Sequence, residues 1–357
     1  MRTLKLLFTI LIAFGFTYNA AAQNGELFKI DVAYIIKDET ACNSLKIIDQ
    51  RPDKEDIGYV SRGYKGRFSL VTGQSIEDYL PAVYDEMRVG EKDGDQLLLV
   101  LYDLQIKDRV GDDESGIFYV SGDFFRGNGD NYHYVASLDS LYEVRSETDV
   151  TDRLLSGSQV QIQLLLAEYG SMQAVDSKVY TLAAASAKRK TDKQAYPIYT
   201  TANFKKGIYY TVDQFLNNAP VDTPFVKKTY IRDNGLKTNY LHYLNEKGKT
   251  GKQIDEATFF AAFDGTDWWV PNINYCTIMR YQNGEFYATK FFNQRYAGTY
   301  SSAASDVGLS LGLLGALVAT SIDMSDARRV KKEWSLYSGK FDPITKEFKP
   351  VDRFTHK

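Results

Sequence analysis

The chain has 357 residues, of which 46 are acidic and 43 are Lys or Arg, so its formal net charge at neutral pH is −3. That balance argues against nucleic acid as a partner, because proteins that bind nucleic acid present basic surfaces to the phosphates. The 26 tyrosines and 20 phenylalanines favour β-strands.

The N-terminus has the pattern of an export signal. Two basic residues precede the apolar run 6–16, and Ala20 and Ala22 occupy the small-residue positions of a signal-peptidase site. The run is shorter than the roughly 18 to 20 residues that a membrane-spanning helix needs. We therefore expect residues 1–22 to be a signal peptide and the mature protein to be periplasmic, associated with the outer membrane, or extracellular.

The mature chain keeps two cysteines, Cys42 and Cys276. Export permits a disulfide between them, but two cysteines far apart in sequence do not form a disulfide framework. Two buried, reduced thiols that act as small apolar side chains are the other interpretation.

A change of composition divides the chain into two domains. Residues 183–197, "AAASAKRKTDKQAYP", lose apolar periodicity and contain four basic residues within six positions. We interpret 188–197 as a linker, or as the frayed end of a helix, between domains 23–187 and 198–357. Limited proteolysis is then expected to cut first between Lys188 and Lys193.

The first domain mixes strand and helix periods. The expected order is a strand over 44–51, a helix over 74–87 with Ser75 as its N-cap and Pro81 inside it, a strand over 95–106, a hairpin of strands over 116–125 and 132–144, and a helix over 148–169. The sequence Ser156-Gly157-Ser158 weakens the middle of that last helix. A strand, a helix, several strands and a helix make an α+β layer pattern.

The second domain is predicted to be β-rich. Thr211 and Gln214 have the spacing of a capping box for a short helix. Asn283-Gly284 predicts a hairpin turn between two aromatic-rich strands, and a final hairpin is expected to turn at Ser338-Gly339. The fold class is therefore α+β, a mixed N-terminal domain followed by a β-rich C-terminal domain with an inserted Gly-rich apolar segment.

Two short stretches carry resemblances. In "IIDQRPDKEDIGYV", the residues Asp49, Arg51, Ile57 and Gly58 resemble the opening of periplasmic lipoproteins of the ABC-transport auxiliary type, in a chain that lacks their lipid-bearing cysteine. That resemblance implies a non-enzymatic envelope protein. The pairing of "KKGIYYTVDQFLNNAP" with "WSLYSGKFDP" resembles secreted and envelope proteins of unknown function from Bacteroidetes-type bacteria, which implies no particular activity.

No motif predicts a reaction. The histidines His133, His242 and His356 are widely spaced, and the chain has no P-loop, no dinucleotide fingerprint and no Gly-x-Ser-x-Gly. The acidic stretches "GDDESG" and "GNGDN" lack the spacing of a calcium loop and are typical of solvated turns. We predict no catalytic residue, metal site or cofactor, and a function in binding or assembly. The alternative is a secreted carbohydrate-active protein, as a glycan binder or a glycoside hydrolase.

Trp268 and Trp269 are the candidate ligand-binding residues. Adjacent residues of a strand point to opposite faces, so one ring is expected to be buried while the other faces solvent or a partner. An exposed ring beside Asp264 and Asp267 suits stacking on a sugar. Both rings packing on the two faces of a sheet is the alternative.

The apolar segment 307–322, "VGLSLGLLGALVATSI", raises the question of a membrane. Its small residues recur every fourth position, as in helices that approach closely in lipid, and form a candidate helix-contact ridge of Gly308, Gly312, Ala316 and Thr320. Three interpretations stay open: a helix packed on its own domain or on a second copy, a helix in a membrane, and a flexible loop. The expected partners are accordingly an envelope protein or a glycan, a membrane surface, and a second copy of the chain.

We predict that the mature protein begins at Gln23. Intact mass spectrometry of protein purified from the native host checks this, because loss of residues 1–22 leaves a chain whose mass follows from the sequence. A retained leader would contradict the export assignment.

Overall fold

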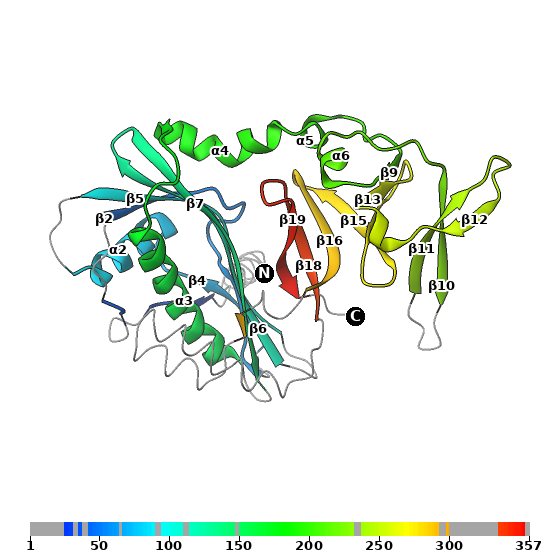
Figure 1. The fold of residues 1–357 in the computed structure, drawn as a ribbon. Coiled ribbons are helices and arrows are strands. Elements are labelled where there is room, and N and C mark those ends of the chain that lie inside the picture. The colour runs from blue at the N-terminus through cyan, green and yellow to red at the C-terminus, as the bar shows by residue number, and fades with distance from the viewer. Residues whose placement is uncertain are drawn as a thin grey trace, which may run out of the picture.

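The computed structural model describes residues 25–30, 35–37, 42–63, 66–89, 94–109, 114–146, 150–231, 237–292, 298–299 and 335–353. Their strands form two sheets, and helices lie on the first sheet and along the edge between the two (Figure 1). The protein is a β-rich α+β protein, as predicted. The predicted signal peptide 1–22 and the apolar segment 307–322, with its candidate ridge, lie outside the described residues.

The first sheet is built around three long antiparallel strands, β5, β6 and β7. Its order is β1-β4-β3-β5-β6-β7-β17, with β2 also pairing with β5 and β8 with β7. The strands are β1 (Gly25–Leu27), β2 (Cys42–Asp49), β3 (Gly58–Ser61), β4 (Arg67–Val71), β5 (Asp95–Arg109), β6 (Glu114–Asn128), β7 (Asn131–Ser146), β8 (Val179–Tyr180) and β17 (Gly298–Thr299). The predicted strand over 95–106 and the predicted hairpin are confirmed.

Helices α2 (Ile76–Met87) and α3 (Thr151–Ser171) cover one face of this sheet (Figure 1). Ser75 caps α2 as predicted, because its side chain accepts a hydrogen bond from the amide of Asp78 at 3.1 Å. The leucines Leu97, Leu99 and Leu101 of β5 point to this face and are buried in the main core. Alternate residues of the same strand face the other side, so β5 reads as a continuous apolar run.

The weak middle of α3 has a packing explanation. A Cβ atom at Gly157 would lie 2.8 Å from the hydroxyl of Tyr142 on β7, so a larger residue would push the helix off the sheet. The glycine therefore allows close approach of helix to strand, at the expense of helix propensity.

The second sheet is antiparallel, in the order β19-β18-β16-β15-β14-β13-β9. Its strands are β9 (Gly207–Tyr209), β13 (Ala261–Phe263), β14 (Trp268–Pro271), β15 (Cys276–Gln282), β16 (Glu285–Phe292), β18 (Ser335–Asp342) and β19 (Glu347–Arg353). The short helices are α5 (Pro197–Thr200), α6 (Val212–Leu216) and the 3-10 turn η3 (Glu256–Thr258). The capping box between Thr211 and Gln214 opens α6 as predicted.

Three further strands form an arm on the second sheet. They are β10 (Phe225–Ile231), β11 (Lys237–Leu244) and β12 (Thr250–Gln253), with β11 in the middle. The arm joins the sheet where Asn239 of β11 pairs with Cys276 of β15. It lies at the end of the molecule farthest from the first sheet (Figure 1).

The two turns predicted for this half have different outcomes. Asn283 and Gly284 have φ angles of 52° and 77° and close the β15–β16 hairpin as predicted. The turn predicted at Ser338-Gly339 is wrong, because β18 runs through these residues and the chain turns at 343–346. Gly339 is instead needed for packing, since a Cβ there would lie 2.7 Å from the ring of Phe292.

Residues 188–197, interpreted from the sequence as a linker or as the frayed end of a helix, are mostly helical, so the second interpretation is closer to the structure. Residues 182–194 form helix α4 (Leu182–Gln194), which is capped by Thr181 and followed at once by α5. The buried residue of α4 is Ala185, so its sequence shows no periodic apolar stripe that would predict a packed helix. The helix packs through charged side chains instead.

A substitution at Gly58 tests how closely β3 approaches β5 in the first sheet. The φ of Gly58 is 130°, which disfavours any other residue, and a Cβ would lie 2.0 Å from the carbonyl oxygen of Ile106. We expect Gly58→Ala to lower the free energy of unfolding by about 3 kcal/mol or more, measured by urea denaturation. Gly63→Ala is the control, with a φ of 51° and no atom within 4 Å of its Cβ, and should lower it by only about 1 kcal/mol. Equal losses in the two variants would contradict the close approach.

Candidate functional site

The two sheets meet at an interface that combines an apolar cluster with buried charges. The hairpin β18–β19 and helix α4 lie against the face of the first sheet opposite to α2 and α3 (Figure 1). The apolar part is a cluster of Ile117, Tyr119, Leu141 and Tyr337, with Phe292 and Val351 packed against it. The charged part, described next, is the candidate functional site.

Asp139 of β7 is at the centre of the charged part. Its carboxylate accepts hydrogen bonds from the hydroxyl of Tyr119 at 2.9 Å and from the ammonium of Lys340 at 3.1 Å. The guanidinium of Arg189 and the ammonium of Lys349 lie 3.7 and 3.9 Å away. The Asp139 side chain is only 5% exposed, so these partners replace its water.

The surroundings hold this carboxylate and its main partner in their charged forms. Burial alone would raise the pKa of Asp139, but Lys340 and Arg189 outweigh it and lower the pKa below its ordinary value. Burial alone would lower the pKa of Lys340, but Tyr119 and Asp139 outweigh it and raise the pKa. Neither group exchanges a proton near neutral pH, so neither is suited to general acid–base catalysis.

Arg189 attaches α4 to the first sheet. Its guanidinium donates to Asp123 at 2.8 Å and to the hydroxyl of Ser121 at 2.6 Å, and lies 4.2 Å above the ring of Tyr102. Asp123, which is 1% exposed, also accepts from Tyr102 at 3.0 Å and from Ser137 at 2.6 Å. The carboxylate is thus fully hydrogen-bonded in a buried position.

One turn further along α4, Lys193 reaches the second sheet. Its ammonium pairs with Glu285 at the start of β16. Burial lowers the pKa of Lys193, although Glu285 opposes the shift. Arg189 and Lys193 are four residues apart and lie on one side of the helix, so α4 connects the two sheets.

A second buried carboxylate lies at the other end of the interface. The hydroxyl of Tyr337 on β18 donates to Glu143 on β7, and both side chains are fully buried. Arg145 donates to the same carboxylate at 2.9 Å. The hairpin β18–β19 is therefore attached to β7 at two acidic residues, Asp139 and Glu143.

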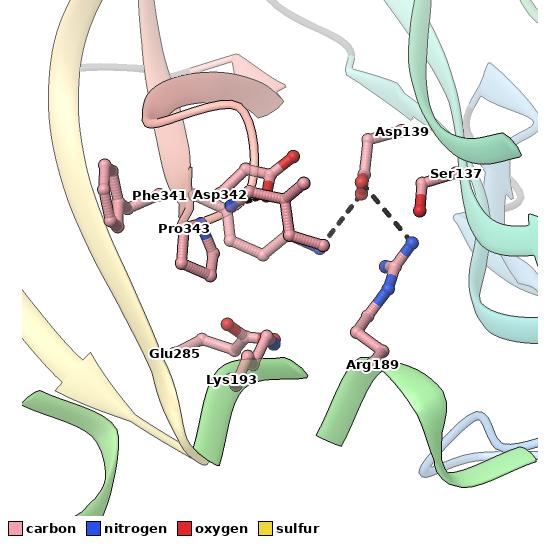
Figure 2. A pocket seen from close by; sticks show the side chains of 10 residues that line it. Ser137, Asp139, Arg189, Lys193, Glu285, Phe341, Asp342 and Pro343 are labelled. Carbon is pink, nitrogen blue, oxygen red and sulfur yellow. Dashed lines mark hydrogen bonds and ion pairs between the residues drawn. The ribbon is translucent and has the colours of Figure 1, made fainter. Parts of the chain in front are cut away.

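A hollow of about 350 Å³, including its opening to solvent, lies within the charged part (Figure 2). In Figure 2 the side chains of Asp139 and Arg189 point toward each other from the first sheet and α4. The hollow is lined by Ser137, Asp139, Arg189, Lys193, Glu285, Lys340, Phe341, Asp342, Pro343 and Ile344. Three cations face three anions, so the hollow has no net charge to select a charged ligand.

Lys290 is a buried amine outside this hollow. Burial lowers its pKa to about 8, and its ammonium lies 4.8 Å above the ring of Phe348. A neutral amine is a nucleophile, but no acidic side chain of the described residues lies within ion-pair distance of it. Lys290 is not among the residues that line the hollow.

The tryptophans do not form the predicted platform. Trp268 is 4% exposed and Trp269 is 1% exposed, so the expectation that one ring faces solvent is wrong. Each packs into a different apolar cluster on either face of β14, which was the alternative interpretation. Asp264 accepts a hydrogen bond from the indole of Trp269 at 2.9 Å and so serves packing.

The Asp-x-Arg stretch has a structural role. Arg51 and Asp49 form a buried ion pair at 2.8 Å, and the guanidinium also donates to the carbonyls of Lys54 and Asp56. The pair closes the turn that follows β2. It leads the chain to Gly58, where β3 approaches β5.

The cysteines and histidines are dispersed. Cys42 and Cys276 are reduced and buried in different sheets, and burial raises the pKa of both thiols, that of Cys276 to about 12. His133 lies on β7 and His242 on β11. No group of three metal-ligating side chains occurs in the described part of the chain.

The apolar segment 307–322 lies outside the described residues, between the paired strands β16 and β18 in the sequence. Phe292 pairs with Ser335, so the chain leaves and re-enters the sheet at neighbouring positions. The described helices include none with the length and apolar character to cross a bilayer. The three interpretations of the segment, a packed helix, a helix in a membrane and a flexible loop, stay predictions.

The residues of the charged part were not singled out from the sequence. Asp139 and Glu143 alternate with Leu141 in "LDSLYEV", which is the pattern of a strand with one solvated face. Arg189 and Lys193 fell in the predicted linker. The available signal was the recurrence of acids on one face of a long strand together with bases elsewhere, and it does not identify which bases meet which acids.

The chain matches no family model and no curated protein. Among solved structures it is similar to the crystal structure of an uncharacterized protein, with 12% sequence identity and a TM-score of 0.22. That similarity covers 37% of this chain and 97% of the other chain. A TM-score this low carries no argument about fold or function.

A substitution at Asp139 tests whether the stability of the protein depends on the charged part. We expect Asp139→Asn to lower the free energy of unfolding by about 3–5 kcal/mol at neutral pH, because Lys340 remains buried without the carboxylate that it pairs with. Lys346→Ala is the control, since its pair with Asp213 is exposed, and should change stability little. A loss no larger in Asp139→Asn than in the control would show that the interface does not depend on this carboxylate.

The pH dependence of unfolding gives a second test. The lowered pKa of Asp139 contributes stability that is present above the ordinary aspartate pKa and is lost as the pH falls. The raised pKa of Lys340 contributes stability that is present below the ordinary lysine pKa and is lost as the pH rises. Denaturation midpoints should therefore be highest between about pH 5 and pH 10, and Asp139→Asn should flatten the acid side. An unchanged acid side in the variant would contradict the assignment.

Proposed function

We propose that the chain is an exported cell-envelope protein that acts by binding or assembly. The observation that carries this proposal is that the acids and bases buried at the interface hold the two sheets together. Asp139, Lys340 and Arg189 are held in fixed charged forms and join the sheets, whereas a catalytic site needs groups poised to exchange protons. The export signal and the two resemblances support the same proposal.

The proposed organisation is a mixed domain over 23–187 and a β-rich domain over 198–357 that carries the apolar segment 307–322. Each half has its own apolar core, which supports this division. Helix α4 and the charged part would then set the orientation of one domain on the other. A surface shared by the two domains suits a protein that presents a fixed shape to a partner.

The carbohydrate-active alternative loses its main support. It depended on an exposed tryptophan beside Asp264 and Asp267, and both rings are buried. Of the titratable groups at the interface, the carboxylates Asp139 and Glu285 are paired with lysines. A retaining or inverting glycosidase needs one carboxylic acid free to donate a proton.

Fractionation of the native host tests the proposal. We expect the mature protein in the envelope fraction, and expect cross-linking of intact cells to join it to envelope components. Purified protein incubated with a panel of envelope and storage glycans should give no turnover. Recovery in the cytosol, or catalytic turnover of a glycan that Asp139→Asn abolishes without unfolding the protein, would overturn the proposal.

A further inference from the structure

The arm β10–β12 is anchored at one side and exposed over most of its surface. Phe225 and Leu241 pack with Trp269 in an apolar cluster at its base. From Lys227 to Ile231, every residue of β10 is exposed, as is all of β12. The arm is therefore a fixed projection at the far end of the second sheet (Figure 1).

The arm is basic in an acidic protein. Its described residues include one acid, Glu246, and six exposed lysines: Lys227, Lys228, Lys237, Lys247, Lys249 and Lys252. None of the six lies within ion-pair distance of an acidic side chain in the described part of the chain. Because the whole chain has 46 acids against 43 bases, the molecule separates a positive arm from a negative body. Such a charge distribution orients the arm toward an anionic surface.

One face of the arm adds aromatic side chains to the lysines. Lys228 pairs with Tyr240 across the strands, and Tyr230 follows on the same face. The rings of Tyr230 and Tyr240 are 5.5 Å apart, edge to face. Tyr230 is 48% exposed, and Ile231 at the end of β10 is 70% exposed.

We propose that this arm binds the anionic headgroups of a lipid bilayer. The inference rests on the proposed envelope function and names the surface that the protein would bind. Lysines near a bilayer are attracted to anionic lipids, and tyrosines favour the boundary between headgroups and acyl chains. The exposed isoleucine favours a lipid surface over nucleic acid, which offers phosphates but no apolar layer.

Vesicle sedimentation tests the proposal with the full mature chain. We expect binding to vesicles that contain phosphatidylglycerol, no binding to pure phosphatidylcholine vesicles, and a steep decrease with added salt. The arm variant carries four reversals, Lys228→Glu, Lys247→Glu, Lys249→Glu and Lys252→Glu. It should bind at least about 100-fold more weakly.

A matched control reverses four exposed lysines of the body: Lys29→Glu, Lys54→Glu, Lys190→Glu and Lys205→Glu. It makes the same change in net charge and should lose less than about 10-fold. Circular dichroism and the melting temperature of both variants should match the parent protein, because the substituted side chains are exposed.

Several results would overturn the inference. The first is an equal loss of vesicle affinity in the arm variant and the control. The second is binding to phosphatidylcholine vesicles as strong as to phosphatidylglycerol vesicles. The third is arm-dependent self-association in solution without vesicle binding. The last would assign the arm to a second copy. If the arm variant binds vesicles normally while the protein still fractionates with the envelope, the inference fails and the proposed envelope function stands.

Discussion

The carboxylate of Asp139 joins three parts of the structure that are distant in sequence. It belongs to β7 of the first sheet, accepts from Lys340 of the second sheet, and lies beside Arg189 of the helix between them. A buried charge is stable only if its partners replace the water that it has lost. The position of the β18–β19 hairpin and that of α4 are therefore linked, because both supply cations to one side chain.

This constraint explains why the first sheet is covered differently on its two faces. Leucines of β5 face α2 and α3, where the packing is mainly apolar and hydrogen bonds such as that from Thr151 to Asp108 add to it. The other face combines apolar residues such as Ile117 and Leu141 with Asp139 and Glu143. Apolar contacts supply the attraction between the sheets, and the ionic contacts specify how they are aligned. The basic arm, at the far end of the second sheet, then has a fixed place relative to the acidic body.

Local signals in the sequence predicted the long strands and helices of the first sheet but not the assembly of the two sheets. The Ser75 cap, the Asn283-Gly284 turn and the long hairpin were predictable because each depends on residues close in sequence. Helix α4 was predicted only as one of two alternatives, because its packing depends on Arg189 and not on an apolar stripe. The charged part was missed because Asp139 and Lys340 are two hundred and one residues apart, and sequence pattern does not report which distant charges meet.

Because buried ion pairs and the apolar cluster join the two sheets, we expect the sheets to unfold as one cooperative unit. Scanning calorimetry of the mature protein tests this most directly, because it compares the measured enthalpy of unfolding with the van't Hoff enthalpy. We expect one transition in which the measured enthalpy and the van't Hoff enthalpy agree. Two resolved transitions at neutral pH, one for each sheet, would contradict it.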